Sequence, residues 1–343
     1  MLPLILLVVF WVSFGGQVWV VERERGALAV LEDRGITEIK GLGNLNHATV
    51  KFRKGYAYVI SRDGYVSLID TDKKKLIRRV KVGESSIGLT FCGNRVAVAN
   101  YDPGTVVILD EDLRVIRVLE TGSRNVGIKS WEGKLVFSLM DRDEIWVLSC
   151  DGERLATFRV SPMPFDALLH EGVYLVGFFG SGKVGFLDLK TMTYRETVLG
   201  GPEEAVLKVP HFGTWGVTES TAYIPAVGER KVYILDLRTR KVKGSIEVPG
   251  LPVFVVLSPD GRFIAVSFSG DKEDFVTLID RERGTVRTEK LGRRVMHLRF
   301  ARDGRHLYIS SYYENRVKKV SVPDLEVLRE FPVPTPSGVF TGG

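Results

Sequence analysis

One pattern recurs eight times along the chain and limits the fold more than any other feature. Each copy consists of an apolar strand, a polar turn and a second apolar strand that usually ends in Asp. The copies read "VWVVERERGALAVLED", "AYVISRDGYVSLID", "VAVANYDPGTVVILD", "LVFSLMDRDEIWVLSCD", "YLVGFFGSGKVGFLD", "AYIPAVGERKVYILD", "IAVSFSGDKEDFVTLID" and "LYISSYYENRVKKVSV". Their ends fall at intervals of 37 to 48 residues, at Asp33, Asp70, Asp110, Asp151, Asp188, Asp236, Asp280 and near Ser321. Such a period indicates a repeat architecture.

Further strands flank each copy, such as "HATVKF" before the second copy and "KLIRRVKVG" after it. Four strands in a unit of about 40 residues is the spacing of a β-propeller blade. The first copy lacks a preceding strand, and "PSGVF" (336–340) supplies one at the other end of the chain. The sequence therefore predicts an all-β, eight-bladed propeller of four-stranded blades over residues 17–343, as a single domain. The C-terminal strand completes the first blade and closes the ring, which removes its open edges.

The first sixteen residues, "MLPLILLVVFWVSFGG", carry no charge. The apolar run is shorter than the roughly 20 residues that span a bilayer, but it suits the apolar core of a secretory signal. We therefore expect residues 1–16 to be a signal peptide or a short N-terminal anchor. The protein would be periplasmic, either soluble after cleavage or tethered by this segment. A disulfide between Cys92 and Cys150 is left open, and without a C-x-x-C-H motif no c-type haem is expected.

The net charge of +6 and the pI of about 9.2 favour anionic partners. The basic residues are scattered, however, and the densest run, "DKKKLIRRVK" (72–81), is typical of a solvated strand edge. Nucleic acid is therefore not a predicted partner.

In a propeller, two kinds of loop surround the mouth of the central channel on one face. These are the loops that lead into each innermost strand, called lead-in loops here, and the loops between second and third strands. Ligands usually bind at such a face. The lead-in loops and strand heads contribute His47, Arg124, Asp166, His211, Trp215, Phe254, His297 and Ser337, and the other loops contribute Arg62, Asn100, Tyr101 and Phe179. His170 and His306 are expected in turns toward the opposite face.

The chemistry of this set indicates a flat, acidic ligand. Arginine binds carboxylates through two parallel hydrogen bonds, imidazole ligates iron or moves protons, and aromatic rings stack on planar molecules. A tetrapyrrole satisfies all three. A structural alternative exists for individual residues: a strand-head histidine can simply be hydrogen-bonded, and Asp166 can be a cap instead of an acid–base group. His297 is the most ambiguous, because strand alternation could turn it away from the channel.

The chain resembles the d1-haem-domain family, which is related to the propeller domain of cytochrome cd1 nitrite reductase. The stretches that carry the resemblance are "GLGNLNHATVKF", "YAYVISRDGYVSLID", "VANYDPGTV", "VFSLMDRDEIWV", "VPHFGTWGV", "PAVGERKVYILD", "GLPVFVV" and "TPSGVF". The similarity extends from about residue 18 to 340. Within this family the chain is most similar to the proteins of d1-haem biosynthesis, which are required to finish the cofactor for nitrite reductase.

This resemblance implies an exported propeller that binds d1 haem or a dihydro-d1-haem type precursor, an iron tetrapyrrole, in denitrification. His47 would be the axial iron ligand or a catalytic group, His211 a distal-side histidine, and Arg62 a clamp on a side-chain carboxylate. His211 and Asp166 would move protons in a late side-chain modification. The implied partners are other d1-haem maturation proteins and nitrite reductase; a homodimer is left open.

One departure from the reductase bears on activity. Near "VLSPDG", where the reductase has a second distal histidine, this chain has Ser258. Nitrite reduction is therefore not expected, because protons must reach the bound ligand on that side. A tetrapyrrole-modifying oxidoreductase or lyase, a non-catalytic carrier of the same tetrapyrrole and a protein-interaction scaffold all remain compatible with the sequence.

Overall fold

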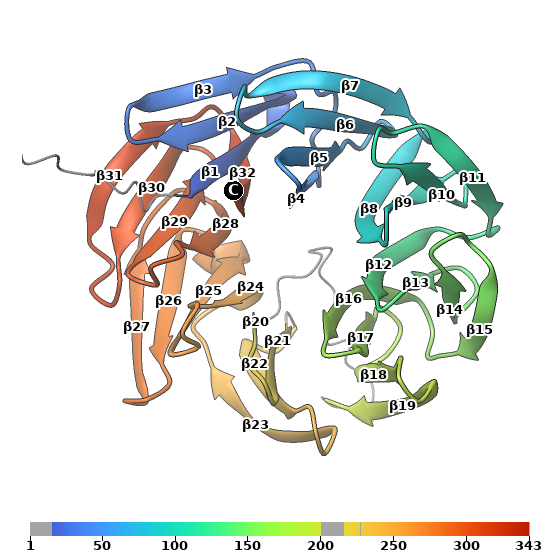
Figure 1. Cartoon of the computed structure of the whole chain (residues 1–343). Helices are drawn as coiled ribbons and strands as arrows, with labels where there is room; N and C mark the ends of the chain where they lie inside the picture. Colours follow the sequence, from blue (N-terminus) through green and yellow to red (C-terminus); the bar gives the residue numbers. More distant parts are fainter. Residues whose placement is uncertain (1–15, 200–215, 227, 343) are drawn as a thin grey trace, which may run out of the picture.

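A computed structural model describes residues 16–199, 216–226 and 228–342. Its strands form eight four-stranded antiparallel sheets, which stand like blades around a central channel (Figure 1). This confirms the predicted eight-bladed propeller. Among the described residues no helix has the length and apolar character needed to cross a membrane. The predicted signal or anchor, apart from Gly16, lies outside the described residues.

The blade that contains both ends of the propeller consists, from the channel outwards, of β32 (Pro336–Gly342), β1 (Gln17–Glu22), β2 (Ala27–Glu32) and β3 (Gly35–Ile39). The next three blades are β4 (Thr49–Arg53), β5 (Tyr56–Ile60), β6 (Tyr65–Asp70) and β7 (Lys75–Lys81); β8 (Ser85–Cys92), β9 (Arg95–Asp102), β10 (Thr105–Asp110) and β11 (Val115–Glu120); and β12 (Asn125–Trp131), β13 (Lys134–Leu139), β14 (Glu144–Ser149) and β15 (Arg154–Arg159).

The remaining four blades are β16 (Pro164–His170), β17 (Val173–Phe178), β18 (Lys183–Asp188) and β19 (Thr193–Val198); β20 (Gly216–Val217), β21 (Thr221–Ala226), β22 (Lys231–Asp236) and β23 (Lys241–Glu247); β24 (Leu251–Leu257), β25 (Phe263–Ser269), β26 (Phe275–Asp280) and β27 (Thr285–Lys290); and β28 (Val295–Phe300), β29 (His306–Ser311), β30 (Arg316–Ser321) and β31 (Val327–Pro332). Two short 3₁₀ turns, η1 (Arg23–Arg25) and η2 (Gly270–Lys272), follow β1 and β25.

The repeated sequence pattern follows from the position of each strand within its blade. The middle strands β9 and β10 are almost entirely buried, because neighbouring blades cover both of their faces, whereas the outermost strand β11 alternates with solvent. The recurring Asp closes the turn that follows the third strand. Asp70, Asp188 and Asp236 each accept backbone N–H bonds at Oδ1 from the residues two and three positions later.

Strand β32 closes the ring as predicted. It pairs antiparallel with β1, so that Phe340 lies opposite Trp19 and Val339 lies opposite Val20. Trp19 and Val339 are fully buried, and the Trp19 ring packs edge-on against Phe52 of the next blade at 5.5 Å between centroids. The two ends of the propeller therefore share one sheet and one core.

Cys92 and Cys150, whose pairing the sequence leaves open, form a disulfide with their Cα atoms 5.3 Å apart. Cys92 is the last residue of β8, and Cys150 directly follows β14. The bond therefore joins two neighbouring blades across 58 residues of sequence.

Candidate functional site

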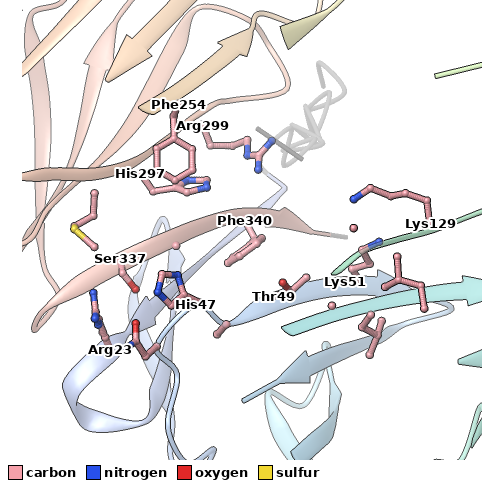
Figure 2. A pocket seen from close by; sticks show the side chains of 18 residues that line it. Arg23, His47, Thr49, Lys51, Lys129, Phe254, His297, Arg299, Ser337 and Phe340 are labelled. Carbon is pink, nitrogen blue, oxygen red and sulfur yellow. The ribbon is translucent and has the colours of Figure 1, made fainter. Parts of the chain in front are cut away.

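A pocket opens in the channel among the innermost strands β4, β8, β12, β24, β28 and β32, together with Arg23 of η1 and the loop before β4. Figure 2 shows its side chains pointing into one space. Of the residues predicted from sequence, His47, Phe254, His297 and Ser337 line it. The ambiguity over His297 is thereby settled in favour of the channel side.

His47 stands two residues before β4, and its backbone has a φ of 58°, in the left-handed region. A residue with a Cβ pays of order 1 kcal/mol for that conformation, which glycine would adopt freely. The surrounding protein removes part of the water around the His47 ring, and this desolvation lowers the pKa of His47. The positive charges of Arg23 and Arg62 also lower it. The ring is therefore neutral at pH 7, the form that binds a metal ion.

His297 on β28 is almost completely buried, at 7% exposure. Its Nδ1 accepts a hydrogen bond from the backbone N–H of Val339 at 3.3 Å. The ring packs edge-on against Phe254, with centroids 4.6 Å apart, and is tilted against Phe340 at 5.9 Å. A β-bulge between Val295 and His297 turns this side chain inward, because an extra residue re-aims those that follow it.

Arg62, in the loop between β5 and β6, lies beside Tyr101, near the end of β9. The Arg62 guanidinium stands 4.6 Å from the centre of the Tyr101 ring, and its Nη1 is buried without a hydrogen-bond partner among the described residues. Burial raises the pKa of Tyr101 to about 12. The neighbouring Asp63 pairs with Arg79 at 3.0 Å, which leaves the Arg62 charge available for an acidic ligand.

Two other predicted residues, Asn100 and Arg124, have partners within the protein. Asn100 is fully buried; its amide donates to the Val82 carbonyl at 2.8 Å and to Thr105 Oγ1 at 3.0 Å. Arg124, at the exposed rim, forms an ion pair with Asp141 in which Nη2 and Oδ1 are 2.5 Å apart. Their predicted roles in cofactor binding stay predictions, and the structure gives each a structural role.

Phe179 and Asp166 both belong to the blade formed by β16 to β19: Asp166 lies in β16, and Phe179 directly follows β17. The Phe179 ring packs against Phe165, with centroids 4.3 Å apart. Asp166 is 2% exposed, and its Oδ1 accepts the backbone N–H of Ala167 at 2.8 Å. His211 and Trp215, the two predicted site residues of the "VPHFGTW" segment, lie outside the described residues.

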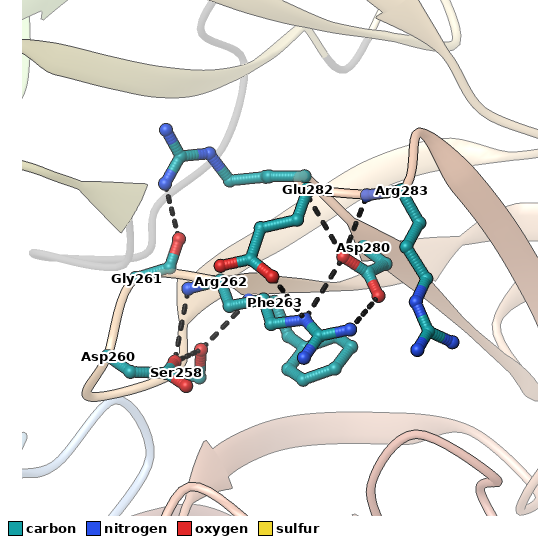
Figure 3. A network of polar contacts seen from close by, with 9 residues as sticks. Ser258, Asp260, Gly261, Arg262, Phe263, Asp280, Glu282 and Arg283 are labelled. Atoms are coloured by element: carbon teal, nitrogen blue, oxygen red, sulfur yellow. Dashed lines mark hydrogen bonds and ion pairs between the residues drawn. The ribbon is translucent and has the colours of Figure 1, made fainter.

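The opposite face holds the residues that the sequence assigned to it. His170 ends β16, with its Nε2 3.3 Å from the carbonyl oxygen of Glu219, and Nδ1 of His306, which begins β29, lies 2.7 Å from Asp303 Oδ2. Ser258 also lies there, directly after β24. Figure 3 shows it in a network in which it donates to Asp260 and accepts the backbone N–H of Phe263. Its hydroxyl closes a turn and does not line the pocket.

The sequence reasoning missed three cations that line the pocket: Lys51 on β4, Lys129 on β12 and Arg299 on β28. All three lie within strands and not in the loops or strand heads from which the sequence predicts ligand contacts. The available signal was a charged residue inside an otherwise apolar innermost strand, in "ATVKF", "VGIKS" and "MHLRF". A charge at such a position is rare unless it serves a ligand or an ion pair.

The donor set of the pocket fits an iron tetrapyrrole with acidic side chains. It combines a neutral imidazole, aromatic rings and several cations. Among these, the Nε of Arg299 is buried without a hydrogen-bond partner in the described part of the chain, as is Nη1 of Arg62, which lies outside the lining of the pocket. Buried donors of this kind are normally satisfied, so each marks a place for an acceptor that the polypeptide itself does not supply.

Comparison with known proteins shows the family of this chain. The family described as Cytochrome D1 heme domain matches residues 16–343, and the chain belongs to this family. More particularly, it is a homologue of the proteins named NirF. It is 33% identical to NirF of Stutzerimonas stutzeri over 351 residues, which cover 94% of this chain and 90% of that protein. With NirF of Pseudomonas aeruginosa the identity is 32% over 350 residues, or 93% and 89% of the two chains.

A more distant relative is the dihydro-heme d1 dehydrogenase of Pseudomonas aeruginosa, 25% identical over 311 residues that cover 83% of this chain and 62% of the relative. The solved structure described as dihydro-heme d1 dehydrogenase NirN in complex with DHE superimposes with a TM-score of 0.83 at 23% identity. It covers 96% of this chain and 76% of that one. This likeness shows that the propeller fold is shared.

Proposed function

We propose that this protein binds d1 haem, or a late dihydro precursor of it, in the channel pocket and acts in a late side-chain modification of d1-haem biosynthesis. The proposal depends on one observation. A neutral imidazole, that of His47, lines the same pocket as cations that lack ion-pair partners in the described chain. The homology to NirF and the complex formed by NirN support this ligand class.

In this proposal the tetrapyrrole is the substrate, and its ring and iron supply the redox and electronic chemistry. His47 would offer a ring nitrogen to the iron from the channel mouth. Arg62 would hold an acidic side chain of the ring. Asp166, with His211, would take up or deliver protons at the modified side chain, and His297 would fix one edge of the pocket through its contacts with Phe254 and Phe340.

We further propose that the protein works in the periplasm and hands its product to other maturation proteins or to nitrite reductase. The disulfide between Cys92 and Cys150 supports an oxidising compartment, because such bonds persist outside the cytosol. The apolar segment 1–16 would serve as the export signal or as a short anchor.

The test is a titration of the purified protein with d1 haem and with its dihydro precursor, followed by visible spectroscopy. Tight binding with a shifted spectrum is expected, and His47→Ala should lose the shift. Binding that is unaffected in both His47→Ala and Arg62→Ala would overturn the proposed site. No binding of either tetrapyrrole would overturn the proposed function.

A further inference from the structure

Three cations project into the channel beyond the strand heads, further along the innermost strands than His47 (Figure 2). They come from every second blade around this half of the ring: Arg299 from β28, Lys51 from β4 and Lys129 from β12. The strands between them carry no acid into the pocket. β32 contributes Ser337, Gly338 and Phe340, and β8 contributes Gly88 and Leu89.

None of the three cations forms an ion pair with any residue in 16–199, 216–226 or 228–342. Elsewhere on the described surface, lysines and arginines are commonly paired, as Lys54 is with Glu111 at 2.9 Å and Arg262 with Asp280 at 2.7 Å. Among the described residues, Asp166 is the one carboxylate whose charge reaches the group, and it favours the charged form of Lys129. The group therefore holds more positive charge than the described chain balances.

This surplus is unfavourable without an anion. Burial and, to a lesser extent, the charge of Lys129 together lower the pKa of Lys51 to about 7. Burial also lowers the pKa of Lys129 and of Arg299. Like charges held in a poorly hydrated site disfavour one another's charged forms, whereas a carboxylate among them restores those forms. The site thus behaves as a receptor for negative charge.

We propose that Lys51, Lys129 and Arg299 form a carboxylate-binding tier beneath the histidines, which receives acidic side chains of the tetrapyrrole. The inference rests on the proposed function and adds to it the residues that hold the acidic side chains of the substrate. It also makes binding a proton-coupled event. A carboxylate beside Lys51 raises the pKa of that amine, so the complex takes up a proton at pH values where the free amine is largely neutral.

The test uses iron-free coproporphyrin, a tetracarboxylate that offers no metal to His47. Calorimetric titrations at pH 8 in two buffers of different ionisation enthalpy measure the protons taken up. We expect uptake approaching one proton per porphyrin in the wild-type protein, because an amine with a pKa of about 7 is mostly neutral there. Lys51→Met should abolish most of the uptake.

The same titration gives the affinity. Lys51→Met and Lys129→Met should each weaken coproporphyrin binding by about tenfold to a hundredfold, the loss of one charge-assisted contact. Lys241→Met, an exposed lysine on the outermost strand β23, is the matched control and should change nothing. Methionine fills the lysine volume without a charge to bury, so the channel variants should fold at least as stably.

Unchanged affinity in both channel variants, or no proton uptake by the wild type, would overturn the carboxylate tier. The proposed function stands or falls separately. His47→Gly should keep its affinity for iron-free coproporphyrin while losing the spectral shift with d1 haem. A protein that binds coproporphyrin but shows no spectral shift with d1 haem would count against the proposed iron ligand alone. A protein that shows the shift but does not bind coproporphyrin would count against the tier alone.

Discussion

The backbone N–H of Val339 donates to Nδ1 of His297, so the strand that closes the ring also fixes an imidazole in the pocket. An Nδ1 that accepts a hydrogen bond places the proton of the neutral ring on Nε2. His297 therefore presents an N–H group as its other ring function. It is suited to donate a hydrogen bond, whereas His47 is the better candidate for iron.

Replacing His297 tests this link between ring closure and the pocket. His297→Phe should keep the aromatic packing but leave the Val339 N–H buried without an acceptor, at a cost of about 1–3 kcal/mol in the free energy of unfolding. Urea denaturation measures this cost. His297→Asn places an amide oxygen close to the position of Nδ1 and should recover part of the loss. Equal stability of wild type and His297→Phe would show that the hydrogen bond contributes nothing.

His47→Gly should separate stability from function. Because the backbone at residue 47 is left-handed, glycine relieves strain of order 1 kcal/mol, partly offset by the larger freedom of glycine in the unfolded chain. The melting temperature should therefore stay the same or rise slightly, while the d1-haem spectrum changes. Added imidazole should restore the spectrum by filling the vacated space. A folded variant with the wild-type spectrum would remove His47 from the iron.

The pH dependence of haem binding should report the charges around His47. Protonation competes with iron for the ring, so affinity is lost as the pH falls through the lowered pKa of His47, below its ordinary value of 6.5. Arg62→Gln removes one charge that depresses this pKa, and the loss should then begin at higher pH. Spectral titrations at a series of pH values locate the midpoint.

Arg238→Gln changes the net charge equally, at an exposed turn after β22 on the other face, and serves as the control. Its midpoint should match that of the wild type. Identical shifts in both variants would mean that overall charge, and not the position of Arg62, sets the profile. The depressed pKa also predicts that stability rises with pH between the lowered value and 6.5, because the unfolded chain binds more protons there.

The bond between Cys92 and Cys150 should contribute about 2–4 kcal/mol to stability, because it constrains a long loop in the unfolded chain. Cys92→Ser with Cys150→Ser should lower the melting temperature accordingly. The wild-type protein treated with reductant should fall to the same value. Mass spectrometry after alkylation counts the free thiols, and two alkylated cysteines in the protein purified without reductant would contradict the bond.

The period of the repeat and the composition were enough to predict the fold, because each blade, apart from the one that closes the ring, is built from consecutive strands. Its turns are closed by residues close in sequence, such as Asp70 and Asp236. Ring closure was also predictable, since one blade lacked a strand that only the C-terminus could supply. The disulfide was not, because the turns of different blades meet only after the blades pack side by side.

The site was predictable in part. Lead-in loops converge in any propeller, which is why His47, His297 and Ser337 were found. Asn100, in β9, and Arg124, directly before β12, occupy equally suggestive positions, but their partners Thr105 and Asp141 become visible only in three dimensions. The channel cations were missed for the opposite reason: alternation along a strand does not by itself say which face looks into a channel and which into a blade.

The pairing of β32 with β1 makes completion of the pocket depend on closure of the ring. Ser337 and Phe340 line the pocket, and their strand is held in place by pairing with β1, which comes from the other end of the propeller. If this one strand pair opens, the first blade loses its innermost strand and the pocket loses one wall in the same step. Local opening of the seam would therefore expose the pocket while the other blades stay folded.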